Sequence, residues 1–530
     1  MMLLNIQNLS LAIHGTPILR NVSMSLEAGK ILGVIGESGS GKSMTAYSVM
    51  RLLPKGARTS GAVTLNGVDI LGASEPTMCG LRGNDIGMVF QEPMTALNPV
   101  KTIGAQVAET IEIHGLGSRA QAHAIARDTL NRVGLPAAQF PMSRYPHELS
   151  GGQRQRVVIA MAIALRPKLL IADEPTTALD VTTQAQILQL LKRLVAEDGM
   201  GMLMITHDLA VVSDLADDIA IMKGGEVVEV GVAATLHRTM CHPYTRALFA
   251  ASGHVPDRNA PDADTPLLQV KNVSRDYRLP RTTVFGGQKY FRAVQGVSFD
   301  IKRGESLGLV GESGCGKSTL TRAILGLEDV QEGEILIDGV PVYSGDAVNR
   351  AVRRKMQVVF QDPYGSFNPR HKVSRLVGEP FHLLDTPPKA AERARLIVQA
   401  LESVGLQAAD AQKFIHEFSG GQRQRIAIAR ALVIKPELII LDEAVSALDV
   451  SIRAQILDLL ADLSDRFGLT YLFISHDLSV VRSITDRVLV MQNGEIVEQG
   501  VTEQVFDAPQ HDYTKTLIAA APMLPDAISA

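Results

Sequence analysis

The sequence has few of the features that nucleic-acid-binding proteins usually carry. Tryptophan is absent, aromatic residues make up 4% of the 530 residues, and the formal net charge is −4. A strong basic excess and stacking aromatic side chains are typical of proteins that bind nucleic acids. The composition therefore argues against that class of protein.

Cysteine is also scarce. Cys79, Cys241 and Cys315 lie far apart, without the spacing of a zinc site and without the four thiolates of an iron–sulfur cluster. So few cysteines suit a reducing compartment. We expect Cys315 to replace a serine as a small packing residue.

Long apolar runs are missing too. The run VVIAMAIAL at 157–165 has nine residues and is followed by Arg-Pro-Lys, whereas a membrane-spanning helix needs about 20 apolar residues. The first residues do not resemble a signal peptide. We expect the chain not to cross a membrane, and its length suits two to four domains.

The chain does contain a long internal repeat. GESGSGKS at 36–43 returns as GESGCGKS at 311–318, and LSGGQRQRVVIA at 149–160 returns as FSGGQRQRIAIA at 418–429. A repeat of about 270 residues is a whole domain. We predict one domain at 1–252, a Pro-, Asp- and Ala-rich linker at 253–266 and a second domain at 267–530.

The octets have the Gly-x-x-x-x-Gly-Lys-Ser pattern of a phosphate-binding loop, or P-loop. Glycines let several backbone N–H groups point at an anion, and the following helix adds the positive end of its dipole. The lysine can reach the β- and γ-phosphates, and the serine hydroxyl can bind Mg²⁺. The predicted nucleotide-binding residues are Gly36, Glu37, Ser38, Gly39, Ser40, Gly41, Lys42 and Ser43, and in the second copy Gly311, Glu312, Ser313, Gly314, Cys315, Gly316, Lys317 and Ser318.

Each copy alternates strand-like and helix-like segments. The runs at 31–35, 169–173 and 438–442 are continuously apolar, as expected of central parallel strands. Residues 119–135 and 390–406 show helical apolar spacing and end near a glycine. We predict an α/β fold with two tandem P-loop NTPase domains, each with a small helical subdomain.

In each copy, a pair of acidic residues lies at the end of the apolar run at 169–173 or 438–442. Asp173 and Asp442 end these strands, where a carboxylate beside a P-loop can bind Mg²⁺. Glu174 and Glu443 come next and are placed to polarise an attacking water. Two strand-end histidines complete the catalytic candidates, because each can hydrogen-bond a γ-phosphate or its water: His207 and His476.

The SGGQ strings form a second possible anion site in each copy. A serine hydroxyl and glycine amides at a helix start can hold an anion, although a simple helix cap is the alternative. Two such anion sites in each domain suggest a composite site that is shared between the domains. The residues are Ser150, Gly151, Gly152 and Gln153, and Ser419, Gly420, Gly421 and Gln422.

These motifs, in this order and duplicated, resemble the nucleotide-binding domains of ABC transporters. The resemblance rests on GESGSGKS, LSGGQ, LLIADE, TALD and ITHD and covers nearly the whole chain. Two fused domains, with "FQEP" and "HPYT" strings, resemble the fused double-ATPase subunit of the bacterial peptide/nickel importer class. The Yej-type oligopeptide and microcin C importers are the nearest resemblance, and glutathione importers have a similar subunit.

The resemblance implies roles for further residues. Gln91 and Gln361 would contact Mg²⁺ and the attacking water, and Asp180 and Asp449 would connect the two sites. The SGGQ string at 150–153 would complete the second P-loop's site, and that at 419–422 the first's. The implied cofactors are ATP and Mg²⁺.

The resemblance also implies partners and a location. Two transmembrane permease subunits and an extracytoplasmic solute-binding protein would complete the importer, with this chain peripheral on the cytoplasmic face of the bacterial inner membrane. ATP would bring the two domains together head to tail, and hydrolysis would release them. The most favoured cargo is an oligopeptide.

Three positions depart from the family pattern. Tyr277 suits the aromatic residue expected under the adenine in the second copy, whereas the first copy has Ile13 there and His14 as the only ring nearby. Weaker adenine stacking in the first site is therefore a hypothesis. Phe418 replaces the usual leucine before SGGQ, and Ala444 replaces the proline of DEPTTALD. Neither change removes a catalytic group, so two hydrolysing sites are predicted.

Alternatives remain open at this stage. Glutathione or nickel could be the cargo, because specificity lies in other subunits. A soluble tandem ATPase of translation or DNA repair is less favoured, since no nucleic-acid-binding surface is visible. The basic insertion at 278–292 could contact lipid headgroups, although an exposed loop is the simpler interpretation.

Overall fold

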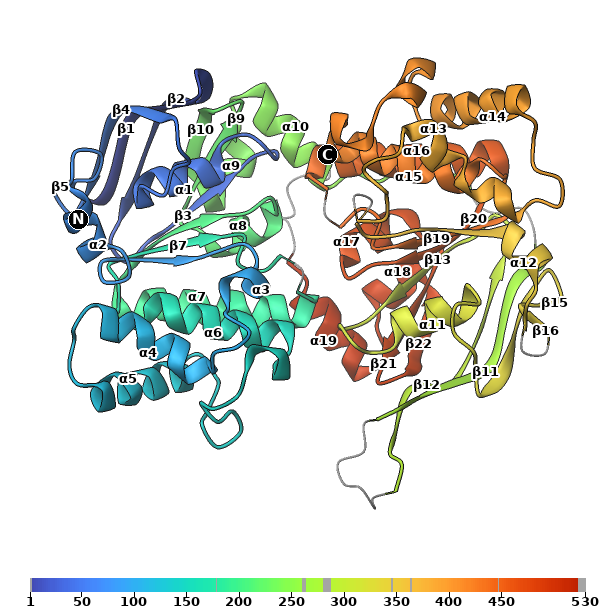
Figure 1. Ribbon diagram of the computed structural model, residues 1–530, viewed down its shortest axis with the longest axis horizontal. Helices are drawn as coiled ribbons and strands as arrows, with labels where there is room; N and C mark the ends of the chain where they lie inside the picture. The colour runs from blue at the N-terminus through green and yellow to red at the C-terminus, as the bar shows by residue number, and fades with distance from the viewer. Residues whose placement is uncertain are drawn as a thin grey trace. The chain divides into compact units, whose positions relative to one another are not determined.

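The computed structural model describes residues 2–177, 179–259, 264–279, 287–344, 347–362, 365–446 and 448–522. The chain divides into two compact units, with the boundary between Gly253 and His254. Each unit contains one copy of the repeat, and Figure 1 shows the elements of each.

The elements of the first unit follow the predicted alternation of strands and helices. In chain order they are β1 (Met2–Ile13), β2 (Thr16–Glu27), β3 (Ile31–Ile35), α1 (Lys42–Met50), β4 (Ala57–Leu65), β5 (Val68–Asp69), α2 (Glu75–Leu81), β6 (Ile86–Val89), α3 (Pro93–Ala96), α4 (Ile103–Ile113), α5 (Arg119–Arg132), the 3-10 helix η1 (Pro146–Glu148), α6 (Gly151–Ile163), β7 (Leu169–Asp173), α7 (Val181–Asp198), β8 (Gly201–Ile205), α8 (Leu209–Leu215), β9 (Asp218–Lys223), β10 (Glu226–Val232), α9 (Ala233–Thr239) and α10 (Pro243–Ser252).

The second unit repeats this order with small additions. Its elements are β11 (Pro266–Arg278), β12 (Tyr290–Lys302), β13 (Ser306–Val310), α11 (Lys317–Ile324), β14 (Glu332–Ile337), β15 (Val340–Pro341), β16 (Tyr343–Ser344), β17 (Ala347–Val348), α12 (Arg350–Lys355), β18 (Met356–Val359), α13 (Val373–Val377), η2 (Glu379–Leu383), α14 (Ala390–Ser403), η3 (Ala408–Gln412), η4 (Ile415–Glu417), α15 (Gly420–Leu432), β19 (Leu438–Asp442), α16 (Val450–Phe467), β20 (Thr470–Ile474), α17 (Leu478–Ile484), β21 (Arg487–Gln492), β22 (Glu495–Val501), α18 (Thr502–Asp507) and α19 (Asp512–Ala520).

A mixed sheet forms the centre of each unit. The strand order is β10-β9-β3-β8-β7-β6 in the first unit and β18-β19-β20-β13-β21-β22 in the second. All neighbours are parallel except the pairs β9–β10 and β21–β22. The carboxyl ends of β3, β7 and β8 therefore lie at one edge of the sheet, where ligands bind in such folds.

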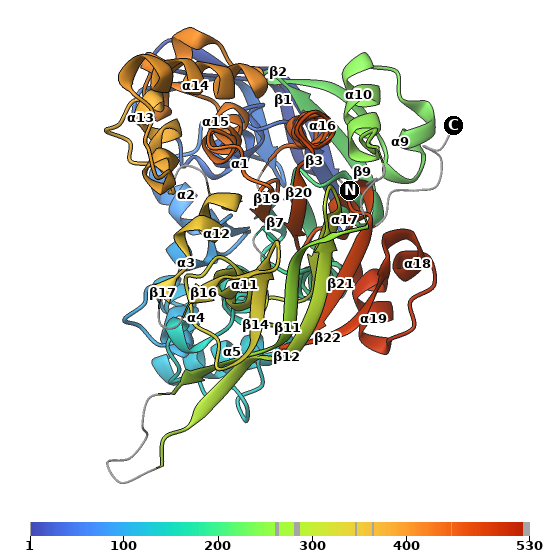
Figure 2. The same ribbon diagram turned by 90° about the vertical axis from the view of Figure 1, so that its right-hand side faces the viewer.

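An antiparallel sheet in each unit packs over the helix that follows the P-loop. The first has the order β2-β1-β4-β5, and the second the order β12-β11-β14-β15. Figure 2 shows β11, β12 and β14 running side by side. Their buried side chains share one core with α1 or α11 and one face of the mixed sheet. The apolar patterns of the sequence do not predict these sheets.

The predicted helical subdomains are present. In the first unit α4 and α5 pack on each other and on α6 (Figure 1). The predicted helices at 119–135 and 390–406 correspond to α5 and α14. The glycines that follow them, Gly134 and Gly405, have φ of +81° and +77°, as a left-handed helix end requires.

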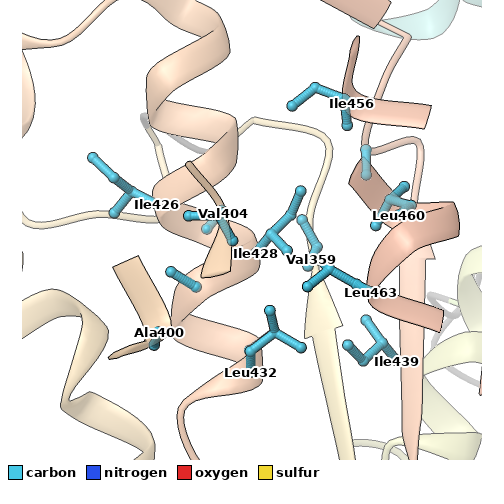
Figure 3. Close-up of a cluster of buried hydrophobic side chains, with 14 of the residues drawn as sticks. Val359, Ala400, Val404, Ile426, Ile428, Leu432, Ile439, Ile456, Leu460 and Leu463 are labelled. Atoms are coloured by element: carbon cyan, nitrogen blue, oxygen red, sulfur yellow. The ribbon is translucent and has the colours of Figure 1, made fainter. Parts of the chain in front are cut away.

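A second hydrophobic core lies on the other face of the mixed sheet, between the sheet and the helical subdomain. In the second unit, side chains from α14, α15 and α16 converge with those of β18 and β19, as Figure 3 shows. Helix α15 lies within this cluster, and it begins at the second SGGQ string. The packing therefore fixes the position of that string relative to the sheet of its own unit.

Part of the predicted linker is attached to the second unit. The Arg258 guanidinium pairs with Asp486 and is almost fully buried, and its Nη1 donates to the Gly304 carbonyl at 3.3 Å. The Asn259 side chain donates to Asp465 at 2.8 Å. Residues 260–263 of the linker, and residues 280–286 of the basic insertion, lie outside the described residues. Arg292 of that insertion forms a bidentate pair with Asp276 at 2.8 and 3.0 Å.

None of the helices in the described ranges is both long and apolar enough to span a membrane.

Candidate nucleotide-binding and hydrolysis sites

The first P-loop runs from the buried strand β3 into α1. Gly36 has φ +154°, and a Cβ there would lie 2.2 Å from the carbonyl oxygen of Met222 on β9. Gly41 caps α1 with φ +100°. Both positions exclude a side chain, so the loop backbone stays close to the sheet and its N–H groups stay accessible.

The P-loop lysine folds back over its own loop. Lys42 Nζ donates to the carbonyls of Gly36 at 2.6 Å and Glu37 at 2.9 Å. The second P-loop has the same arrangement, with Lys317 Nζ at 2.7 and 2.9 Å from the carbonyls of Gly311 and Glu312. The lysine lies in the loop from which we expect it to reach a phosphate.

The serine after the lysine lies near the strand-end aspartate. Ser43 Oγ donates to Asp173 Oδ1 at 3.1 Å. Burial raises the pKa of Asp173 to about 6, against the opposing effect of the Ser43 hydrogen bond. In the described residues no hydrogen bond joins Ser318 to Asp442, although burial likewise raises the pKa of Asp442.

These groups offer the oxygen ligands that Mg²⁺ prefers. A hydroxyl, a carboxylate and an amide are available in each unit, and Mg²⁺ usually takes one or two carboxylates together with phosphates and water. The residues that would hold the ion are Ser43, Gln91 and Asp173, and Ser318, Gln361 and Asp442.

Glu174 is held by three side chains, one from its own turn and two from distant segments of the chain. Gln91 Nε2 donates to its Oε2 at 2.8 Å, Thr177 Oγ1 donates to the same oxygen at 2.8 Å, and His207 Nδ1 lies 3.3 Å from its Oε1. The backbone of Glu174 is left-handed, with φ +48°, and its N–H donates to the Ile205 carbonyl at 2.8 Å. A strained non-glycine residue persists only where its surroundings determine the conformation.

The second unit repeats this cluster. His476 Nδ1 lies 3.3 Å from Glu443 Oε1, and Gln361 is close enough to help lower the pKa of this carboxylate. Glu443 has φ +51°, and its N–H donates to the Ile474 carbonyl at 2.8 Å. Thus the predicted residues Gln91, Glu174 and His207, and Gln361, Glu443 and His476, are brought together in each unit.

Both glutamates are ionised at neutral pH. Burial raises the pKa of Glu174, but the contacts with His207, Thr177 and Lys42 outweigh this and lower it to about 2. Burial also opposes the ionisation of Glu443, and its contact with His476 lowers the pKa below the usual value. Each carboxylate can therefore accept a hydrogen bond from a water molecule beside the P-loop.

The SGGQ serines cap their own helices. Ser150 Oγ accepts from the Gln153 N–H at 3.3 Å, and the Ser150 N–H donates to Gln153 Oε1 at 3.0 Å, a capping box. Ser419 and Gln422 form the same pair at 3.5 and 3.1 Å. Both serines are exposed, so the start of each 13-residue helix faces solvent within its unit.

Tyr277 lies at the end of β11, close to the helix of the second P-loop. Its hydroxyl lies 3.3 Å from Thr319 Oγ1 and also donates to Glu328. In the first unit the same hairpin is a tight turn, because His14 and Gly15 have φ of +48° and +87°. The difference between Tyr277 and Ile13 is thus part of a difference in hairpin length.

The remaining departures fit their surroundings. Cys315 is buried, and burial raises the pKa of its thiol, so it stays protonated. If Gly311 carried a Cβ, that atom would lie 2.8 Å from Cys315 Sγ. A Cβ at Gly36 would lie at the same distance from Ser40 Oγ, so the cysteine and the serine occupy equivalent places. Phe418 is buried to the same extent as Leu149 in the first unit.

One contact with the P-loops was not foreseen from the sequence. The hydroxyls of Tyr244 and Tyr513, from the HPYT and HDYT strings, accept the N–H groups of Glu37 and Glu312. Both strings repeat, but a hydrogen bond across about 200 residues of sequence has no local signal. The role of Thr177 was missed for a different reason, since it is a serine, Ser446, in the second copy.

These sites define a class of protein. Residues 19–177 and 294–446 match the ABC transporter family, and residues 228–275 and 497–529 match the C-terminal region of the oligopeptide/dipeptide transporter family. The chain belongs to the ABC transporter family. It is an ATPase subunit of the peptide/nickel importer class, with the two α/β domains that the sequence predicts.

Two similar proteins from bacteria have a common name. The chain is 47% identical over 560 residues to "Glutathione import ATP-binding protein GsiA" of Salmonella paratyphi A (strain ATCC 9150 / SARB42), covering 98% of this chain and 89% of the relative. It is 46% identical over 541 residues to the protein of the same name in Escherichia coli (strain K12), covering 95% and 86%. Among solved structures, a chain of the dimeric, post-hydrolysis ATP-binding cassette MJ0796 is 29% identical, with a TM-score of 0.39, covering 44% of this chain and 98% of that one.

Proposed function

We propose that both units hydrolyse ATP with Mg²⁺, and that Glu174 and Glu443 each orient the attacking water. The observation that supports this most directly is the repeated cluster, in which the His207–Glu174 and His476–Glu443 contacts both measure 3.3 Å. A degenerate site would be expected to lose one of these groups. Each unit instead keeps its P-loop lysine, glutamate, glutamine and histidine.

The other groups have separate roles in this proposal. Backbone N–H groups of the P-loop and the lysine ammonium bind phosphates, and the histidine supports the glutamate and the γ-phosphate. Mg²⁺ neutralises charge on the phosphates when it is bound. Because the transition state of phosphoryl transfer carries its charge on these oxygens, positioning and charge supply most of the catalysis.

We also propose that the SGGQ string of each unit completes the nucleotide-binding site of the other unit. The exposed helix starts at Ser150 and Ser419 support this, because the N–H groups of the two glycines after each serine have no intrahelical partner and the helix dipole suits an anion. Ser150, Gly151 and Gly152 would then serve the second P-loop, and Ser419, Gly420 and Gly421 the first.

Paired substitutions test both parts of this proposal. Glu174→Gln with Ser419→Arg places both changes in one composite site, so single-turnover hydrolysis should continue at the other site, with about half of the wild-type burst. Glu174→Gln with Ser150→Arg damages both sites, and hydrolysis should fall by at least 100-fold, the usual range for losing a catalytic base.

The outcome that contradicts shared sites is the reverse pattern, with the Ser150 combination active and the Ser419 combination inactive. Ser150→Arg and Ser419→Arg alone serve as controls. Retention of the full wild-type rate by Glu174→Gln with Glu443→Gln would show that these glutamates are not the bases.

We propose, further, that the chain powers import of short peptides, with the tripeptide glutathione as the first candidate. The support is the match to the oligopeptide/dipeptide transporter C-terminal region and the names of the 46–47% identical relatives. The partners would be two transmembrane permease subunits and an extracytoplasmic solute-binding protein. The chain would be peripheral on the cytoplasmic face of the inner membrane.

Uptake in cells tests the cargo. A strain that lacks this chain should take up less labelled glutathione than its parent, and the wild-type chain should restore uptake, whereas Glu174→Gln with Glu443→Gln should not. Unrelated tripeptides and nickel in the same assay distinguish the alternatives. Co-sedimentation with ribosomes or DNA, and no loss from membranes when the permease genes are deleted, would contradict an importer.

A further inference from the structure

The peptide unit that opens each P-loop is held on both of its edges. In the first unit, the Gly36 carbonyl accepts from Lys42 Nζ at 2.6 Å, and the Glu37 N–H of the same peptide donates to the Tyr244 hydroxyl at 3.2 Å. Lys42 belongs to the loop itself, but Tyr244 lies 207 residues away, on α10. The loop is therefore tied to an element near the end of its unit.

The second unit contains the same arrangement. The Gly311 carbonyl accepts from Lys317 Nζ at 2.7 Å, and the Glu312 N–H donates to the Tyr513 hydroxyl at 2.9 Å. Both tyrosines are more than nine-tenths buried. Two copies that share this contact while differing in many surrounding residues indicate that the contact has a role.

The start of each C-terminal helix is fixed so that the tyrosine points at the loop. Nδ1 of His242 and of His511 caps the helix by accepting the tyrosine N–H, at 3.1 and 3.2 Å. The backbone N–H groups of the same histidines donate to Glu229 and Glu498 at 3.1 and 3.0 Å.

The glutamates connect this helix start to the P-loop strand. Glu229 lies on β10, which pairs with β9, and β9 pairs with β3. Glu498 on β22 occupies the same place relative to β21 and β13. The tyrosine and the loop thus approach each other from two elements of one sheet, and little relative motion is available to them.

We propose that Tyr244 and Tyr513 are positioning residues for ATP binding, and that each holds the first peptide of its P-loop in the orientation that receives the phosphates. The inference rests on the ATPase function of the family and adds one tyrosine to each nucleotide site. The C-terminal HPYT and HDYT segments are thereby assigned a function within the nucleotide sites.

We expect the tyrosine to contribute more to holding the loop in the nucleotide-bound state than in the nucleotide-free state. For the lysine ammonium to reach the β- and γ-phosphates, it must leave the Gly36 or Gly311 carbonyl at least in part. The peptide is then held on one edge only, by the tyrosine. Loss of the phenolic oxygen should therefore weaken nucleotide binding more than it weakens the nucleotide-free fold.

Tyr244→Phe with Tyr513→Phe tests the proposal in the full chain, because it removes the two oxygens and keeps both rings. The dissociation constant for a fluorescent ATP analogue with Mg²⁺ should rise by roughly 3- to 10-fold, the range expected for one hydrogen bond per site. The KM for ATP should rise to a similar degree, while kcat changes by less than about twofold. The melting temperature without nucleotide should stay near the wild-type value, and its increase on adding ATP should shrink.

Tyr471→Phe is the matched control. Its hydroxyl is also buried and donates to the Leu460 carbonyl at 2.9 Å, but it belongs to the packing of α16 on β20. This variant should lower the melting temperature and leave ATP affinity unchanged. If the Tyr244 and Tyr513 double variant binds ATP within twofold of the wild type, or loses affinity only to the extent that Tyr471→Phe does, the tyrosines are structural and the proposal is wrong. The single variants show whether each tyrosine acts on its own site.

Discussion

The two glycines of each SGGQ string have different physical roles. A Cβ at Gly152 would lie 2.3 Å from Thr183 Cγ2, and one at Gly421 would lie 2.6 Å from Ile452 Cγ2. At Gly420 a Cβ would meet no atom within 4 Å. The second glycine is therefore needed for close packing of the SGGQ helix on the next long helix, α7 or α16, whereas the first is not required by packing.

Gly421→Ala should destabilise the second unit, because its methyl group must displace Ile452 or shift α15. Overpacking of this kind costs about 1–3 kcal/mol. Urea unfolding, followed by circular dichroism, measures the change in the free energy of unfolding. The control is Gly420→Ala, which should have at most a small effect, since alanine is favoured over glycine in a helix. Equal losses in both variants would contradict a packing role.

At the scale of single residues, the sequence predicted those that belong to local motifs. Lys42, Asp173 and Glu174 could be proposed as site residues because the chemistry of their motifs is repeated in the second copy. Contacts between distant segments, such as that of Tyr244 with Glu37, could not be assigned, because nothing in the HPYT string indicates which backbone group its tyrosine meets.

Helices α10 and α19 begin at a carboxylate that lies on a neighbouring strand. Glu229 accepts the N–H groups of Cys241 and His242 at 2.7 and 3.1 Å. Burial tends to raise the pKa of Glu229, but these backbone hydrogen bonds outweigh it, and the pKa is lowered. The pKa of Glu498 is lowered in the same way by the N–H groups of Gln510 and His511.

These depressed pKa values predict how stability depends on pH. A carboxylate whose folded-state pKa lies below its unfolded value stabilises the fold above the unfolded pKa, and the effect is lost as the pH falls through the folded pKa. Glu229→Gln with Glu498→Gln should therefore lower the melting temperature at pH 7, by about 2–4 °C if solvent screening leaves roughly 1 kcal/mol. The difference from the wild type should shrink below about pH 4. A difference that stays constant from pH 7 to pH 3.5, measured by differential scanning fluorimetry, would show that the charge is not responsible.

At the scale of elements, helices were easier to predict than the antiparallel sheets. Helices α5 and α14 have clear apolar spacing and a glycine at the end. Strand β1 does not alternate regularly between buried and exposed residues, because its pairing with β2 shifts register at several points and Asn8 has φ +49°. Each such bulge moves the following side chains to the other face, so the period of two is lost from the sequence.

At the scale of the whole molecule, the two units are near copies that differ around their sites. Ser43 bonds Asp173, whereas Ser318 and Asp442 do not form the equivalent bond in the described residues. Lys223 Nζ lies 4.6 Å from the centre of the Tyr244 ring, and the equivalent residue of the second unit is the uncharged Gln492. The duplication was evident from the sequence, but these differences depend on contacts and were not.

The attachment of the linker determines how closely the two units are tethered. Helix α10 ends at Ser252, and the His254 ring already lies 2.5 Å from Asp458 of the second unit. The covalent connection between the units therefore contains very little free chain. A short tether keeps the effective concentration of one unit around the other in the millimolar range. The shared-site proposal requires the two ATPase domains to meet, and a short tether makes that encounter independent of how much of the protein a cell makes.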